Sequence, residues 1–355
     1  MNAPVLALDR VTKHFVVRRS LLGAPTAVVR AVDGVSLELN RGETLALVGE
    51  SGCGKSTIGR LILRLIEPTA GTVRLDGQDL ASLSTSDLRH ARAGAQLIFQ
   101  DPYSSLNPRM MVGEMLAEPL LLHTDLSPTS RRERVGDLLR IVGLLPQHAQ
   151  RYPHEFSGGQ RQRIAIARAL AVEPKLIVCD EPVSALDVSI RSQILNLLRD
   201  LQQRLGLAYV FISHDLAVVK HIATRAAVMY LGRIVENAPV DQVFAEPRHP
   251  YTQALLSAIP QLSPGIKRER RILPGDPPNP VAPPAGCHLH PRCLHVQDIC
   301  RTKSPDLVHE GDGHATACHR WRDIVSSPSL APVPEPVFSP SLRRLFQAFE
   351  APAQE

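Results

Sequence analysis

Hydrophobic residues follow two different patterns over residues 1–245. Residues 5–15 (VLALDRVTKHF), 35–40 (VSLELN) and 71–75 (GTVRL) tend to put apolar side chains at every second position, which is typical of antiparallel strands. Residues 44–49 (TLALVG), 175–180 (KLIVCD) and 208–213 (AYVFIS) are almost continuously apolar, as expected of central parallel strands covered on both faces. Helix-like stretches separate these strands. The pattern predicts one α/β domain with a mixed sheet.

The composition changes at about residue 246. Residues 246–250 (EPRHP), 259–265 (IPQLSPG) and 273–286 (LPGDPPNPVAPPAG) are rich in proline, which favours extended connectors. We expect a small irregular region over 246–322, with a short helix at 251–259, and a proline-rich tail over 323–355. The tail ends in a short amphipathic helix, whose apolar face is formed by Leu342, Leu345, Phe346 and Phe349.

Composition narrows the class of protein. The chain has 355 residues, of which 44% are hydrophobic, so it can bury a sizeable core. It contains no apolar run long enough to span a membrane and no secretory signal at its start, which predicts a cytoplasmic protein. The net charge of +5 is scattered among acids, so a solvated surface is a better interpretation than a nucleic-acid site.

Residues 49–57 (GESGCGKST) fit the pattern G-x-x-x-x-G-K-[ST] between a predicted strand and a predicted helix. Small residues let successive N–H groups curl around a phosphate at the helix N-terminus. Lys55 would bring a positive charge to the phosphate oxygens, and the Ser56 hydroxyl would be an oxygen ligand for Mg²⁺. We therefore predict an ATP site that contains Gly49, Ser51, Gly52, Gly54, Lys55, Ser56 and Thr57.

Two acids follow the apolar strand at 175–180. Ligands of open α/β sheets bind at the carboxyl ends of the strands, where Asp180 and Glu181 emerge. Asp180 is predicted to hold Mg²⁺, and Glu181 to orient and polarise the water that attacks the γ-phosphate. A pair of acids that merely faces solvent is the alternative.

Residues 156–163 (FSGGQRQR) open a predicted helix whose hydroxyl and free N–H groups point at an anion. This stretch resembles the signature of the ATP-binding-cassette (ABC) ATPases, usually LSGGQ, with Phe156 in place of leucine. In that family the anion is the γ-phosphate of a nucleotide held by the other subunit. The resemblance therefore implies a dimer whose composite sites use Ser157, Gly158, Gly159 and Gln160.

Other residues resemble the remaining family marks and occur in the family's order. Gln100 resembles the glutamine that touches Mg²⁺ and the attacking water, and His214 the histidine that contacts the γ-phosphate. Asp187, in the run SALD, resembles part of a loop across the dimer interface. Phe15 is a candidate for the aromatic on which adenine stacks, with core packing as the alternative. The implied fold is a P-loop ABC ATPase domain with a helical subdomain at about residues 101–170.

Residues 101–109 (DPYSSLNPR) and 248–256 (RHPYTQALL) narrow the resemblance, together with the cysteine-bearing extension. They resemble the ATPases of bacterial dipeptide and oligopeptide importers, most closely the second of their two ATPase subunits. The resemblance implies a sister ABC ATPase as heterodimer partner, two transmembrane permease subunits and an extracytoplasmic peptide-binding protein. It also implies a peripheral position on the cytoplasmic face of the inner membrane.

Cys287, Cys293, Cys300 and Cys318 cluster in the extension, separated by five, six and seventeen residues. This spacing does not choose a metal, since four thiolates suit either Zn²⁺ or a [4Fe–4S] cluster. The importer resemblance implies the [4Fe–4S] cluster, with zinc and no metal as alternatives. We interpret its role as structural, because a metal offsets the cost of ordering a proline-rich segment. We expect the histidines between His288 and His319 to be solvated.

The function we predict is ATP hydrolysis that drives peptide import. Two alternatives keep the ATPase but change its work: a soluble ABC ATPase acting on nucleic acid or ribosomes, and an importer ATPase for nickel, glutathione or another small solute. A third alternative is a metal-regulated binding module that does not hydrolyse ATP.

Overall fold

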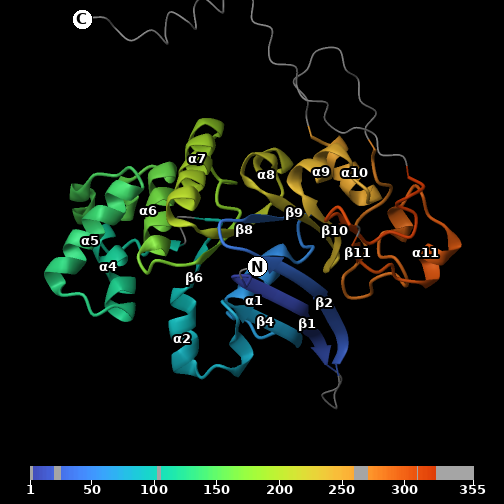
Figure 1. Ribbon diagram of the computed structural model, residues 1–355, viewed down its shortest axis with the longest axis horizontal. Coiled ribbons are helices and arrows are strands. Elements are labelled where there is room, and N and C mark those ends of the chain that lie inside the picture. Colours follow the sequence, from blue (N-terminus) through green and yellow to red (C-terminus); the bar gives the residue numbers. More distant parts are fainter. Residues whose placement is uncertain (1–2, 20–24, 102–104, 260–270, 310, 325–355) are drawn as a thin grey trace, which may run out of the picture.

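The computed structural model describes residues 3–19, 25–101, 105–259, 271–309 and 311–324. The amphipathic helix expected around Leu342 lies outside the described residues. Two β-sheets and the helices around them form the fold (Figure 1).

The smaller sheet is antiparallel, with strand order β2-β1-β4-β5. Its strands are β1 (Leu6–Arg19), β2 (Pro25–Leu39), β4 (Ala70–Leu75) and β5 (Gln78–Asp79). Leu6 pairs with Leu39 and Leu8 with Leu37, and all four side chains are buried. The period-2 alternation of the sequence thus gives one buried face, as expected.

The larger sheet has the strand order β11-β12-β10-β9-β3-β8-β7-β6. Its strands are β3 (Thr44–Val48), β6 (Ala95–Ile98), β7 (Leu176–Asp180), β8 (Ala208–Ser213), β9 (Arg225–Tyr230), β10 (Arg233–Pro239), β11 (Val308–His309) and β12 (Ala315–Thr316). From β9 to β6 neighbouring strands are parallel, while β10, β12 and β11 pair antiparallel. The mixed sheet expected from the apolar runs is confirmed.

Helices flank both sheets and fill the two ends of the molecule (Figure 1). They are α1 (Lys55–Ile62), α2 (Thr85–Ala93), α4 (Val112–His123), α5 (Pro128–Ile141), α6 (Gly158–Leu170), α7 (Val188–Leu205), α8 (Leu216–Ile222), α9 (Val240–Ala245), α10 (Pro250–Ser257) and α11 (Asp298–Thr302). The helix α10 falls where the sequence predicted a short helix. The helix predicted after the phosphate loop is α1. It ends at Ile62, and Arg64 takes a left-handed conformation (φ 49°) two residues later.

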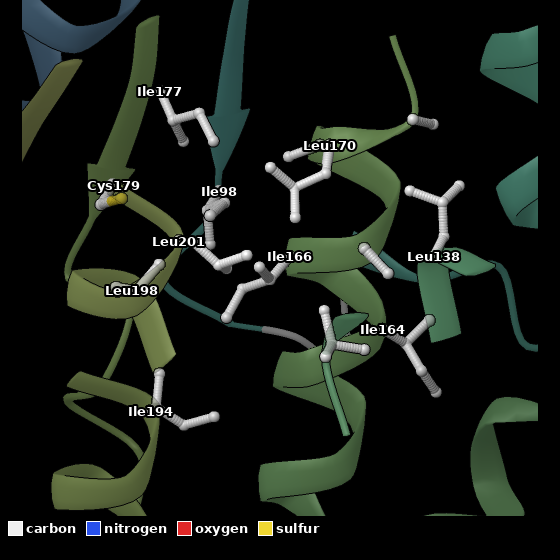
Figure 2. Packing of buried hydrophobic residues seen from close by; sticks show 14 of the residues in the cluster. Ile98, Leu138, Ile164, Ile166, Leu170, Ile177, Cys179, Ile194, Leu198 and Leu201 are labelled. Atoms are coloured by element: carbon white, nitrogen blue, oxygen red, sulfur yellow. The ribbon is translucent and has the colours of Figure 1, made fainter. Parts of the chain in front are cut away.

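Helices α4, α5 and α6 gather at one end of the molecule and join the large sheet through a shared core (Figure 1). Figure 2 shows Ile166 of α6 towards Leu198 and Leu201 of α7, with Leu138 of α5 on the opposite side of α6. Ile177 and Cys179 of β7 complete the contact with the sheet. This apolar contact fixes the helical end against β7, the strand that ends at the predicted catalytic acids.

The residues after α9 pack against the same sheet at its other end. Strand β12 pairs with β10, so that Ala315 lies opposite Asn237 and Thr316 opposite Glu236. Tyr251 and Leu289 are buried in one apolar cluster with Val48 of β3. The division at residue 246 stays a prediction, and the core does not stop there.

A buried carboxylate links the extension to the sheet. Glu236 of β10 is fully buried and accepts hydrogen bonds from the backbone N–H groups of Arg248 (2.7 Å) and His249 (3.0 Å). The Nε2 atom of His314 lies 2.6 Å from the same carboxylate. His314 is only 1% exposed, so the expectation of solvated histidines does not hold for this one. It is buried because it satisfies a carboxylate that has no water to bind.

Candidate functional site

The loop between β3 and α1 is shaped by glycines in conformations that other residues rarely adopt. A Cβ atom on Gly49 (φ 152°) would lie 2.2 Å from the carbonyl oxygen of Met229, and one on Gly54 (φ 112°) 2.0 Å from that of Ala31. Both positions therefore require glycine. The loop runs tightly against β9 and β2 and delivers the chain to the first turn of α1 at Lys55.

The Lys55 side chain is buried within this loop. Its Nζ atom donates hydrogen bonds to the carbonyl oxygens of Gly49 and Glu50, both at 2.8 Å. Carbonyl oxygens of the loop therefore hold the ammonium group in the loop that leads into α1, where a phosphate would be bound.

Ser56 and Asp180 place two oxygen atoms beside the loop. The Ser56 hydroxyl donates to Oδ1 of Asp180 at 2.9 Å, across the gap between α1 and the end of β7. Burial raises the pKa of Asp180, and the neighbouring Glu181 adds to the effect, although the Ser56 hydrogen bond opposes it. Mg²⁺ prefers hydroxyl and carboxylate oxygens, so this pair fits the cation.

Three residues predicted to act on the attacking water or to contact the γ-phosphate meet at the carboxyl edge of the sheet. The amide of Gln100, just after β6, donates to Oε2 of Glu181 at 2.9 Å. Nδ1 of His214, just after β8, lies 3.1 Å from Oε1 of the same carboxylate. Glu181 itself has a left-handed backbone (φ 47°), a strained conformation that aims its side chain between the other two.

A hollow of about 470 Å³ lies over these groups. It is lined by Val29, Ala31, Ser51, Gly52, Gly54, Lys55, Ser56, Thr57, Gln100, Glu181, His214 and Pro280. Most of the predicted phosphate and water residues thus face one cavity. Sequence reasoning missed Val29, Ala31 and Pro280, which carry no chemical group that a motif could reveal.

Phe15 lies near the hollow but outside its lining. It is 39% exposed on β1, opposite Val29 in the strand register, and Lys13 Nζ lies 5.0 Å from its ring centroid. The stacking of adenine on Phe15 stays a prediction.

The signature residues lie away from this hollow. Ser157 caps α6: its hydroxyl accepts the N–H of Gln160 at 3.3 Å, and the Gln160 side chain accepts the N–H of Ser157 at 3.0 Å. A Cβ atom on Gly159 would lie 2.4 Å from Ile190, while Gly158 has more room. Asp187 caps α7 by accepting the N–H of Ile190 at 3.3 Å. None of these residues lines the hollow of its own chain.

Comparison with known proteins identifies the family. Residues 32–184 match the ABC transporter family, and residues 235–300 match the C-terminal region of oligopeptide/dipeptide transporters. The chain is 54% identical over 319 residues to a probable peptide ABC transporter ATP-binding protein of Sinorhizobium fredii, covering 90% of each chain. It is 52% identical over 318 residues to the dipeptide transport ATP-binding protein DppF of Escherichia coli, covering 90% of this chain and 95% of the relative. The chain belongs to the ATP-binding proteins of the peptide ABC transporters.

Solved structures agree with this assignment. A dimeric ATP-binding cassette in a post-hydrolysis state with ADP and phosphate is 30% identical, with a TM-score of 0.59, and its match covers 66% of this chain and 98% of that one. The protein cbiO1 of Clostridium perfringens, part of the ABC transporter complex cbiONQ, is 26% identical with a TM-score of 0.59, and the match covers 68% of this chain and 91% of that one. The P-loop ABC fold is thus confirmed, and the chain is an ABC-type ATPase.

The four cysteines of the C-terminal extension come together around one small hollow. They are Cys287, Cys293, Cys300 and Cys318. Two of the sulfur atoms accept backbone hydrogen bonds. The N–H of His295 donates to Sγ of Cys293, and the N–H of Arg320 donates to Sγ of Cys318, each at 3.4 Å. Burial raises the pKa of Cys287 to about 11 and that of Cys318 to about 12, and the neighbouring thiols add to the effect. Within the part of the chain that the structure describes, no group of three or more His, Cys, Asp and Glu side chains is arranged to hold a metal ion. The predicted iron–sulfur site is therefore not supported by the geometry.

Among the helices of the described ranges, none is both long and apolar enough to cross a membrane.

Proposed function

We propose that this ATPase energises the import of di- or oligopeptides across the bacterial cytoplasmic membrane as one subunit of an ABC importer. One observation carries the proposal. The region that resembles the C-terminal part of oligopeptide/dipeptide transporters, residues 235–300, is packed into the core of the ATPase sheet rather than attached to it by a linker. Relatives that match about 90% of the chain bear peptide-transport names. This favours peptides over nickel or glutathione, and import over work on nucleic acid.

In the proposed reaction, the triphosphate of ATP occupies the hollow beside the phosphate-binding loop. Lys55 and the loop N–H groups would bind the β- and γ-phosphates. Ser56 and Asp180 would hold Mg²⁺, which would neutralise phosphate charge. Glu181 orients the attacking water, and the hydrogen bonds to Gln100 and His214 keep its carboxylate in place.

The active unit is a dimer of two cassettes. Because the Ser157 segment lies outside the hollow of its own chain, a signature helix from a second cassette would close the site over the γ-phosphate. We expect that cassette to be a sister ATPase. Two permease subunits would supply the membrane path and an extracytoplasmic protein the peptide, with this chain bound peripherally on the cytoplasmic face. Leu121 and Leu122 at the end of α4 are more than half exposed, which supports the helical end as the permease contact.

The four cysteines are proposed to hold a [4Fe–4S] cluster that orders the extension. The proposal rests on the resemblance of the extension to that of the peptide importers. The four thiols surround one hollow, and backbone N–H groups point at two of them, but no three of the described His, Cys, Asp and Glu side chains are arranged to hold a metal ion. Iron, sulfide and zinc analysis of anaerobically purified protein separates the cluster from zinc and from no metal. If the purified protein is colourless, contains no metal and is still stably folded, this part of the proposal is wrong.

Uptake assays test the function as a whole. Cells that lack this chain should lose uptake of a radiolabelled dipeptide, recover it with the wild-type chain, and not recover it with Glu181→Gln. Membrane proteins, and no nucleic acid, should co-purify with the tagged chain. If deletion abolishes uptake of nickel or glutathione and leaves dipeptide uptake intact, peptides are not the cargo.

A further inference from the structure

Glu50, the second residue of the phosphate-binding loop, is bound through each of its polar groups. Its carbonyl oxygen accepts from Lys55 Nζ at 2.8 Å, which is a contact within the loop. The other two partners come from the C-terminal extension. The N–H of Glu50 donates to the hydroxyl of Tyr251 at 2.8 Å, and its carboxylate is bound by Arg292.

The ion pair between Arg292 and Glu50 joins a buried guanidinium to a carboxylate whose side chain is 31% exposed. Arg292 is 7% exposed, and its two terminal nitrogens lie 3.2–3.4 Å from the carboxylate oxygens of Glu50. Nη1 also lies 3.5 Å from the Tyr230 hydroxyl. Loss of the Glu50 charge would leave the buried guanidinium without its partner, whereas loss of Arg292 would release a carboxylate that water reaches.

Arg292 belongs to the cysteine segment. It ends a short 3₁₀ turn (His290–Arg292) and stands between Cys287 and Cys293 in the sequence. The turn is fixed by the Arg292 N–H, which donates to the Leu289 carbonyl at 2.9 Å, and Leu289 is buried in the shared core. The guanidinium therefore reaches Glu50 only if this segment is folded.

Tyr251 reaches the loop independently, from α10. Its ring is fully buried and packs against Tyr230 with ring centroids 4.6 Å apart. The extension also touches the site at Pro280, which lines the hollow and whose carbonyl accepts the N–H of Arg30 at 3.3 Å. Tyr251, Pro280 and Arg292 all lie more than 200 positions from Glu50 in the sequence, so no motif of the phosphate loop includes them.

We propose that Arg292 and Tyr251 position the phosphate-binding loop, so that the folded cysteine segment sets the affinity of the enzyme for ATP. A glycine-rich loop has many conformations, and only the one with converging N–H groups binds phosphate. The apparent affinity for ATP is reduced by the fraction of molecules in which the loop is correctly placed. Arg292 contacts no reacting atom, so it is a positioning residue. The inference depends on ATP binding alone and would survive if peptides were not the cargo.

Substitutions that remove the pair test the proposal in the full-length protein. Arg292→Met should raise the Kd for ATP with Mg²⁺ about tenfold or more, while turnover at saturating ATP in the assembled complex changes less than about threefold. Arg292→Lys, which keeps the charge without the fork, should recover part of the affinity. Arg301→Met is the matched control, since Arg301 is an exposed arginine in the same segment, and it should leave the Kd unchanged.

A double-mutant cycle guards against misfolding. Glu50→Gln keeps the shape of the loop and should raise the Kd as Arg292→Met does, and the double variant should be no worse than either single one, because the two residues act as a pair. If Arg292→Met does not unfold cooperatively, its Kd is not informative, and the Kd of folded Glu50→Gln tests the proposal instead. An unchanged Kd in folded Glu50→Gln overturns the proposal, as does an equal rise in Arg301→Met.

Reciprocal coupling gives a readout that a purely structural role would not move. If the segment sets ATP affinity, ATP must stabilise the segment. Hydrogen exchange of amides in residues 287–301 should slow on addition of ATP with Mg²⁺ in the wild type and not in Arg292→Lys at equal nucleotide occupancy. Exchange that ignores ATP in the wild type contradicts the coupling.

Discussion

Replacement of Glu181 by glutamine keeps the size of the side chain and removes its charge. Both carboxylate oxygens are engaged, one by Gln100 at 2.9 Å and the other by His214 at 3.1 Å, so the group is held where it can orient water. The loss should fall on the transition state. Groups of this kind contribute about 3–4 kcal/mol, so phosphate release should slow by a factor of about 10² to 10³. The Kd for ATP should change less than about threefold, because Lys55 and the loop are untouched.

The backbone of Glu181 allows a second, independent measurement. Its left-handed conformation (φ 47°) costs a residue with a Cβ about 1–2 kcal/mol, and glycine avoids this cost. Glu181→Gly should therefore be more stable than Glu181→Ala by about 1 kcal/mol after the greater chain entropy of glycine is subtracted, whereas ordinary positions favour alanine. Both variants should be inactive.

Glu173 is the matched control, since it has nearly the same conformation (φ 51°) at a turn outside the site. Its glycine variant should also be more stable than its alanine variant, with ATPase activity unchanged. Urea denaturation and steady-state phosphate release measure the two effects. Wild-type turnover in Glu181→Gln, or alanine more stable than glycine at position 181, would refute the reasoning.

Three further predictions concern buried charges. Because burial raises the pKa of Asp180, lowering the pH towards that pKa should weaken Mg²⁺-dependent ATP binding. Asp180→Asn should abolish the gain in ATP affinity that Mg²⁺ gives, and with it this pH dependence, in equilibrium titrations. Burial lowers the pKa of His249 to about 4, so the imidazole binds a proton more tightly in the unfolded chain than in the folded one. The free energy of unfolding should therefore be at its full value above about pH 6.5 and fall by up to about 1.4 kcal/mol per pH unit down to about pH 4. His249→Asn, which keeps an acceptor at the start of α10, should flatten that slope in urea denaturation as a function of pH. Glu236→Ala should lower the free energy of unfolding by about 3 kcal/mol, because three buried donors lose their acceptor, while Glu246→Ala on the exposed end of α9 should cost less than about 0.5 kcal/mol.

The parts of the fold that sequence could predict are those whose cause is local. The strands around β3, β7 and β8 follow from continuous apolar runs, and the phosphate loop from glycines whose positions allow no Cβ atom. Asp180 and Glu181 could be placed at the edge of the sheet because the carboxyl ends of parallel strands meet there. In each case the run of sequence that gives the signal is no longer than about ten residues.

The contacts that could not be predicted depend on distant partners. His314 was expected in solvent, since nothing near it in sequence reveals that it binds Glu236, 78 positions away. Pro280 lies in a proline-rich stretch that reads as a connector, yet it lines the hollow through its backbone position and shape. Val29 and Ala31 are ordinary strand residues until the sheet brings β2 beside the loop.

The extension and the catalytic domain share one core, so the change in composition near residue 246 does not mark an end of the buried core. Proline content marks where regular secondary structure thins out, but burial continues: β12 extends the sheet from β10, and Leu289 packs in the same cluster as Val48 of β3. The match to oligopeptide/dipeptide transporters begins at residue 235, inside β10 and before the composition changes. Glu236 in this strand binds backbone N–H groups and a histidine of the extension. An extension built into the core in this way can hold Glu50 in the phosphate loop, which a region joined by a flexible linker could not do.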